Sequence, residues 1–155
     1  MPPLHEGAFA SGAAARIRHD GAMIVQRLDH VNIITDRLTE TAQFYAELLD
    51  LEERDGPAPL LPHQVRWMYD AQGRAILHLN STDCPRVFER GVAPGAETGA
   101  IHHVALRCGD FAVVQARLDA RGADYRVNDV PSIGLKQIFT ADPNNVLLEL
   151  NFFAG

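Results

Sequence analysis

Four polar side chains interrupt strongly apolar stretches of this 155-residue chain, and all four are types that bind metals. His78 and Glu149 each lie between two leucines, and His30 and His103 each precede a valine. A carboxylate in the middle of an apolar strand is costly to bury unless a positive charge compensates it, and a cation held by imidazoles would do so. The competing interpretation is that each residue points to solvent from a half-exposed sheet.

The spacing of these residues repeats along the chain. Leu-Asp-His-Val around His30 aligns with Ile-His-His-Val around His103, and Ala-Ile-Leu-His-Leu-Asn around His78 aligns with Val-Leu-Leu-Glu-Leu-Asn around Glu149. Strands related by such a repeat would bring the four side chains to one point. Three imidazoles and one carboxylate suit one divalent metal ion, which we expect to be Zn²⁺, Ni²⁺, Co²⁺, Fe²⁺ or Mn²⁺ rather than Ca²⁺.

The elements that must position these residues follow a βαβββ order in the first half of the chain. Residues 28–34 are rich in β-branched side chains and predict a strand. Asp36 is then the expected N-cap of a helix whose apolar residues have helical spacing. After a proline-rich loop, residues 64–70 and 74–80 predict the two arms of a hairpin.

The same order recurs in the second half. Residues 101–106 predict a strand, Asp110 is the expected cap of a helix, and Gly122 is expected to end that helix. Three extended stretches follow, at residues 124–130, 135–140 and 146–152. The repeat predicts an α+β fold of two βαβββ modules, residues 26–80 and 100–153, in a single domain of residues 26–153. Residues 1–25 are expected to form a loosely packed or disordered arm.

The composition excludes several classes of function. A formal net charge of −6 and a pI near 5.6 predict no binding to nucleic acid or to anionic lipid. No apolar run approaches the roughly 20 residues of a membrane span. The two cysteines, Cys84 and Cys108, are too few for a disulfide framework, and the N-terminus lacks a signal-peptide pattern. These features predict a cytoplasmic protein.

The sequence resembles the glyoxalase, bleomycin-resistance and extradiol dioxygenase group, the vicinal oxygen chelate superfamily, over roughly residues 26–153. The matching motifs are Leu28-Asp-His-Val, Phe44-Tyr45, His102-His-Val-Ala-Leu, and the segment from Phe139 through Asp142-Pro-Asn-Asn to Glu149. The resemblance implies an open eight-stranded cup around a metal, with the modules paired within one chain or across a homodimer. It implies metal ligands at His30, His78, His103 and Glu149, of which His78 occupies the position that varies in the family.

Alternation along the first strand of each module predicts further residues that face the pocket. Asn32 follows His30 on the same face, and Arg107 shares a face with His103. Arg107 is a candidate for holding a substrate carboxylate or a developing enolate. His102 has the opposite parity and is expected to face the helix side or solvent.

The third strand of each module supplies other predicted pocket residues. The resemblance places an inward residue ten positions before each last-strand ligand, which gives Met68 and Phe139. Alternation then adds Arg66 and Gln137, with Arg66 as a second cation at the site. Trp67 has the opposite parity to Met68 and is expected to pack in the core.

The resemblance implies a metal that binds two neighbouring oxygens of a small-molecule substrate and stabilises negative charge. The favoured function is a lyase or isomerase in which Glu149 takes a proton next to a carbonyl and an enediolate or enolate is held on the metal. Arg66 would hold a substrate carboxylate or the developing enolate. An extradiol ring-cleavage dioxygenase is an alternative, although Phe139 replaces the tyrosine of that subgroup. A bleomycin-resistance-like protein that binds small molecules without catalysis is another.

Overall fold

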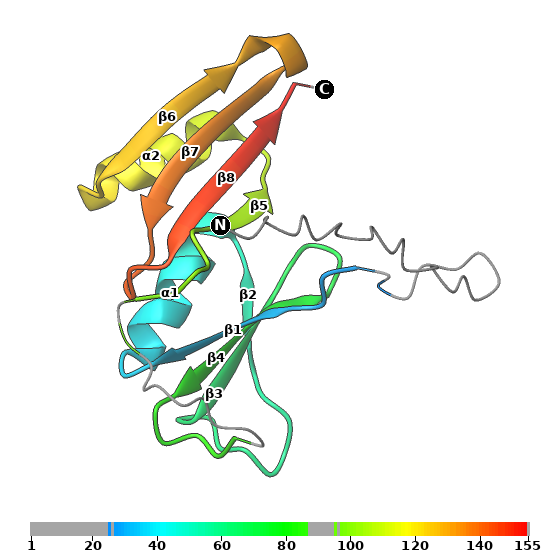
Figure 1. Cartoon of the computed structure of the whole chain (residues 1–155). Helices are drawn as coiled ribbons and strands as arrows, with labels where there is room; N and C mark the ends of the chain where they lie inside the picture. The colour runs from blue at the N-terminus through cyan, green and yellow to red at the C-terminus, as the bar shows by residue number, and fades with distance from the viewer. Residues whose placement is uncertain (1–24, 26, 87–94, 96, 155) are drawn as a thin grey trace, which may run out of the picture.

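The computed structural model describes residues 25, 27–86, 95 and 97–154, so the predicted arm of residues 1–25 lies, apart from Val25, outside the described residues. Within the described residues, eight strands and two α-helices form two βαβββ modules (Figure 1). Each module has its own open four-stranded sheet. The α+β fold class and the repeated module are therefore confirmed.

The first module builds a sheet with the strand order β1-β4-β3-β2. β1 is parallel to β4, and the other neighbours are antiparallel. A parallel first strand requires a crossover, which the helix provides. The elements are β1 (Val31–Thr35), α1 (Leu38–Leu49), β2 (Glu52–Asp55), β3 (Val65–Tyr69) and β4 (Ala75–Ser81).

The second module repeats this topology in the order β5-β8-β7-β6, with β5 parallel to β8. A short 3₁₀-helix, η1, turns the chain between β6 and β7. The elements are β5 (Val104–Arg107), α2 (Phe111–Arg121), β6 (Tyr125–Val130), η1 (Pro131–Ile133), β7 (Leu135–Ala141) and β8 (Leu147–Phe153).

The position of strand β2 was not predicted, because its sequence Glu-Glu-Arg-Asp is exposed at every position and has no hydrophobic alternation. Its backbone pairs with β3. Ion pairs from Glu53 and Asp55 to Arg66 add cross-strand contacts. β2 is thus an edge strand covered with charges, which is a common way to prevent edge-to-edge association.

The helix boundaries differ from the prediction at one end. Arg37 rather than Asp36 is the N-cap of α1, and the Thr35 hydroxyl accepts the Arg37 backbone N–H at 2.9 Å. Asp110 does precede α2, and Gly122 ends it in the left-handed conformation with φ 60°. No helix among the described residues is long and apolar enough to cross a membrane.

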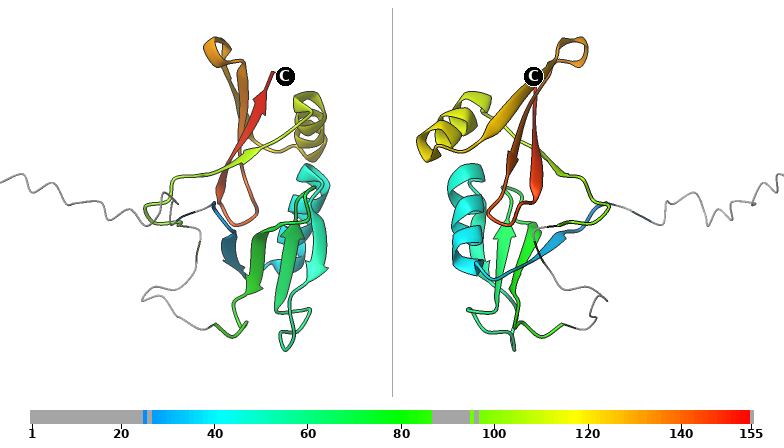
Figure 2. Two further views of the ribbon diagram at one scale, coloured as in Figure 1. Left: turned by 90° about the vertical axis from the view of Figure 1, so that its right-hand side faces the viewer. Right: turned by 60° about the vertical axis from the view of Figure 1, so that its left-hand side comes forward.

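The core lies between the sheets and the helices (Figure 2). Met68, Leu77 and Leu79 are buried beneath α1, whereas Ile138 and Leu150 are buried in the second module. The two helices contact each other, so the buried residues form one cluster. Because each helix covers one face of its sheet, the opposite faces are left open for polar residues.

Candidate metal centre

A stack of three rings lies on the open face of the first sheet. The ring centroid of His78 is 4.1 Å from that of Trp67 with 3° between the planes. On the other side, His78 stacks on His30 with centroids 3.8 Å apart and 18° between the planes. Burial lowers the pKa of His78, and the nearby His30 lowers it further. A neutral imidazole keeps the lone pair that a metal requires.

His30 lies directly before β1 and contacts a carboxylate. Its Nδ1 is 2.9 Å from Oδ2 of Asp29, and this hydrogen bond lowers the pKa of Asp29. Because a carboxylate only accepts, Nδ1 carries the hydrogen, which leaves Nε2 as the nitrogen that can bind a metal. A carboxylate partner of this kind is typical of histidines that bind metals.

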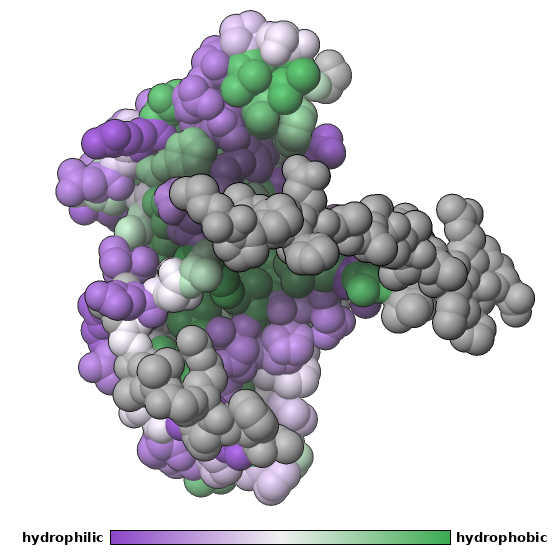
Figure 3. Space-filling view, in the orientation of Figure 1, coloured by the Kyte–Doolittle hydropathy of each residue, from purple (hydrophilic) through white to green (hydrophobic). Residues whose placement is uncertain are grey.

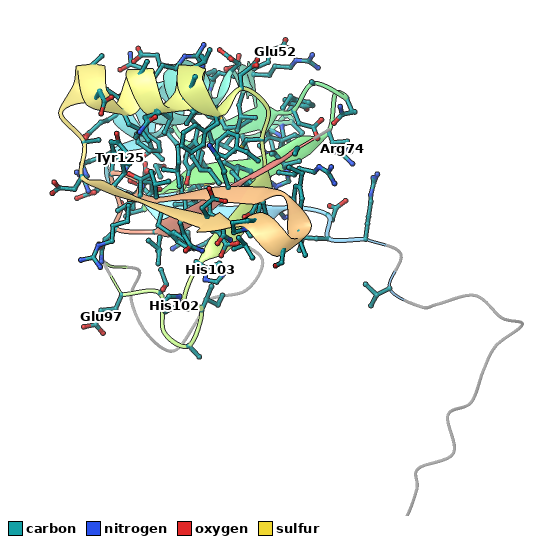
Figure 4. All side chains as sticks on the ribbon, turned by 90° about the horizontal axis from the view of Figure 1, so that it is seen from above. Glu52, Arg74, Glu97, His102, His103 and Tyr125 are labelled. Atoms are coloured by element: carbon teal, nitrogen blue, oxygen red, sulfur yellow. The ribbon has the colours of Figure 1, made fainter. Side chains whose placement is uncertain are left out.

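The second sheet holds a histidine and a carboxylate on its open face. Nε2 of His103 is 3.1 Å from Oε2 of Glu149. Phe139 lies opposite Glu149 in the strand register, and its ring meets His103 edge-on with centroids 6.5 Å apart. Figure 4 shows His103 on the side of this sheet opposite α2. Residues that share this face therefore lie outside the core.

His102 is exposed, as expected, and its ring also contacts His103, which was not predicted. Its Nδ1 is 3.0 Å from Nδ1 of His103, and the planes of the two rings make an angle of 85°. Figure 4 shows the two side chains next to each other. This contact is possible because β5 begins only at Val104, so strand alternation does not govern the two histidines. The His-His dipeptide itself was the signal that could have indicated a joint role.

The four predicted ligands form two pairs, His30 with His78 and His103 with Glu149, on separate sheets. Within the part of the chain that the structure describes, no three His, Cys, Asp or Glu side chains are grouped closely enough to hold a metal ion. The expected convergence of all four residues is therefore not seen within one chain.

The prediction that Met68 lines the pocket is wrong. Met68 is fully buried in the core and lies opposite Leu77. The register shifts next to it, because Tyr69 pairs with Ala75 and Ile76 is skipped. A shift of one residue exchanges the two faces of a strand. Trp67, which we expected in the core, consequently lies opposite His78 on the open face.

The same shift corrects the prediction for Arg66. Its Nε is 2.6 Å from Oε1 of Glu53, its Nη1 is 3.2 Å from Oδ1 of Asp55, and it also donates to the carbonyl of Pro62. Arg66 shares the face of Met68 and joins β3 to the edge strand. It is not a cation of the site.

Other predicted residues lie on the open faces. Asn32 is opposite His78 and donates to Oδ1 of Asn80 at 2.8 Å. Arg107 is opposite Asn151, with its guanidinium carbon 4.6 Å from the ring centroid of Phe153. Arg107 also lines a cavity of about 420 Å³ between the modules, beside Ile76 and Ala105 from the strands of the site.

The sequence profile of the Glyoxalase/Bleomycin resistance protein/Dioxygenase superfamily matches residues 27–150. The chain belongs to this superfamily. No curated protein matches the sequence of this superfamily member at a significant level.

Solved structures share the fold of this superfamily member. A lactoylglutathione lyase from Agrobacterium tumefaciens is 18% identical with a TM-score of 0.59, covering 84% of this chain and 96% of its own. A glyoxylase/bleomycin resistance protein/dioxygenase domain from Frankia is 18% identical with a TM-score of 0.60, covering 84% and 93%. A mutant fosfomycin resistance protein from Listeria monocytogenes, complexed with Mn(II) and dihydroxypropylphosphonic acid, is 15% identical with a TM-score of 0.58, covering 84% and 93%. At these identities the similarity shows the fold alone.

Proposed function

We propose that this superfamily member is a divalent-metal-dependent lyase or isomerase that moves a proton next to a substrate carbonyl. We further propose that its site is assembled from two copies of the chain. The observation that carries the proposal is the division of the ligands into a His30–His78 pair and a His103–Glu149 pair on separate sheets.

A homodimer would complete the site. If the first module of one copy lay against the second module of its partner, each of two equivalent sites would contain three imidazoles and one carboxylate. Leu28 and Ile101, each two residues before a ligand histidine, are 77% and 64% exposed. Figure 3 shows apolar residues gathered in the hollow between the modules. Covering such residues with a partner would remove apolar surface from water.

The donor atoms fit a borderline divalent metal such as Zn²⁺, Ni²⁺, Co²⁺, Fe²⁺ or Mn²⁺. Such an ion, when bound, polarises two neighbouring oxygens of a small substrate. Glu149 is suited to act as the base, because its side chain is only 15% exposed and its Oε2 lies beside His103. Arg107 supplies a positive charge for a substrate anion, and Asn32 and Phe139 line the open faces.

Mixing two defective variants tests both parts of the proposal. His30→Ala with His78→Ala removes one pair, and His103→Ala with Glu149→Gln removes the other. In a shared site, hybrid dimers regain one intact site, so metal content and proton exchange into a 2-oxo or thioester substrate reappear on mixing. His63→Ala is the control, because His63 is an exposed histidine outside both pairs.

Three outcomes would overturn parts of this proposal. A wild-type protein that takes up no transition metal on titration would exclude metal-dependent catalysis and support a binding protein. Metal binding without recovery on mixing would place each site within one chain. Iron with oxygen-dependent yellowing of a catechol would support ring cleavage instead of proton transfer.

A further inference from the structure

A chain of amide hydrogen bonds ends on the carboxylate of Glu149. The side-chain nitrogen of Gln137 donates to Oε1 of Glu149 at 2.6 Å and to Oδ1 of Asn151 at 2.9 Å. The side-chain oxygen of Gln137 accepts from Nδ2 of Asn128 at 2.7 Å. The three partners come from the adjacent strands β6 and β8, directly or diagonally opposite Gln137 in the register.

These contacts define the orientation of the Gln137 amide. Both of its hydrogens are used by acceptors, and its oxygen is used by a donor. If the amide turned over, its oxygen would face Oε1 of Glu149 and its NH₂ group would face the NH₂ group of Asn128. That arrangement replaces hydrogen bonds by repulsion between like groups. The Glu149 carboxylate, which only accepts, and the Asn128 donor together keep the donor end of Gln137 toward Glu149.

We propose that Gln137 is a positioning residue that gives the two oxygens of Glu149 different roles. This inference rests on the proposed function of Glu149. Oε1 stays an acceptor for the Gln137 amide, and Oε2, on the His103 side, is the atom that binds the metal or takes the proton. The sequence predicts Gln137 as a pocket residue that could bind substrate, whereas in the structure both donor hydrogen bonds of its amide go to Glu149 and Asn151.

The arrangement limits rotation of the carboxylate. With Oε1 held by Gln137 and Oε2 beside His103, the carboxylate plane is restrained at both oxygens. A ligand restrained in this way loses less conformational freedom when a metal binds, and loss of such outer contacts typically lowers metal affinity about 10–100-fold. Removing Gln137 should therefore weaken the metal site without removing any ligand.

The decisive variant is Asn128→Asp. Its carboxylate only accepts, so it competes with Glu149 for the Gln137 amide and favours the turned-over orientation. We expect a drop of about tenfold or more in Co²⁺ affinity, measured by titration, and a similar drop for Gln137→Met. Asn128→Ala removes the orienting contact but adds no competitor, so its loss should be smaller.

A second variant separates the orientation of the Gln137 amide from the change in net charge. An added negative charge by itself attracts a cation, so a purely electrostatic effect of Asn128→Asp would raise Co²⁺ affinity. Lys136→Gln makes the same change in net charge on the other face, where Nζ of Lys136 lies 5.3 Å from the ring centroid of Phe111. Metal affinity that is unchanged or raised in both Asn128→Asp and Gln137→Met would overturn the inference.

A second measurement needs no metal. In nuclear magnetic resonance spectra, the two side-chain amide hydrogens of Gln137 should show hydrogen-bonded shifts in the wild type. In Asn128→Asp these shifts should change, because the amide turns from Glu149 to the new carboxylate. Free amide shifts in the wild type would contradict the inference, even if metal binds. Failure of the wild type to bind Co²⁺, with the amide shifts as expected, would instead count against the proposed function.

Discussion

The hydroxyl of Tyr45 donates a hydrogen bond of 3.1 Å to Oδ2 of Asp142, and both residues are buried. Tyr45 belongs to α1 in the first module, whereas Asp142 begins the turn between β7 and β8 in the second. Oδ1 of Asp142 accepts the backbone N–H groups of Asn144 and Val146, each at 2.8 Å. Two motifs of the sequence, Phe44-Tyr45 and Asp142-Pro-Asn-Asn, thus meet and join the modules.

Removal of this contact should destabilise the protein. Tyr45→Phe takes a donor from a buried carboxylate, and we expect a loss of about 1–3 kcal/mol in the free energy of unfolding. Denaturant unfolding measures this loss. Tyr125→Phe is the matched control, because the Tyr125 hydroxyl also donates to a carboxylate, that of Asp119, at 2.7 Å but at an exposed position. Equal losses in the two variants would contradict a special role for the buried pair.

Stability should fall in alkaline solution partly because of Cys108. Burial raises the pKa of its thiol from 9.0 to about 11. The unfolded chain therefore releases this proton at lower pH than the folded chain. The contribution of the protonated Cys108 thiol to the free energy of unfolding is complete below pH 9 and is lost as the pH rises toward 11. Cys108→Ala should show a shallower decline in urea unfolding across this range. A decline identical to that of the wild type would exclude Cys108 as a cause.

Trp67 should report metal binding through its fluorescence, because it is the only tryptophan in the sequence and stacks on His78. The rings of His30 and His78 are nearly parallel, with 18° between their planes, so their in-plane lone pairs converge on one ion only if the stack rearranges. We expect Co²⁺ to quench the emission of the wild type and of His63→Ala, and to leave that of His78→Ala largely unchanged. Emission that does not change while the wild type takes up Co²⁺ would place the metal elsewhere.

Gly56 lies against the buried side chain of Val65, and a Cβ added there would come within 2.4 Å of Val65 Cγ1. Gly56→Ala should therefore cost about 1–3 kcal/mol, measured by thermal or denaturant unfolding. Gly109→Ala is the control, because nothing lies within 4 Å of an added Cβ at that position. A Gly56→Ala variant as stable as Gly109→Ala would show that the β2–β3 connection can shift to make room.

Much of the fold could be predicted from local patterns. Hydrophobic periodicity indicated the two helices and most of the strands, and the repeat indicated their βαβββ order. It also indicated that His30 and His78 belong together, and that His103 and Glu149 belong together. The position of strand β2 escaped prediction because its four residues are all exposed, so only its backbone pairing with β3 identifies it.

The face of each side chain on β3 could not be predicted. Placing Met68 ten positions before His78, and Arg66 by alternation from Met68, assumes an unbroken register, and the shift between Met68 and Tyr69 exchanges the faces. This shift buries Met68, pairs Arg66 with the edge strand and turns Trp67 toward His78. Such a shift depends on the register in which β3 and β4 pair, and the pattern of each strand alone does not predict that register.

The sequence by itself determined which side chains are available for chemistry and which module carries each of them, because residue type and strand periodicity are local properties. Only the tertiary structure decided how the two pairs are placed. They lie on two sheets that are joined by helix packing and by the Tyr45–Asp142 contact rather than by strand pairing. Distances between modules depend on contacts far apart in the chain, and a repeat in the sequence does not specify them.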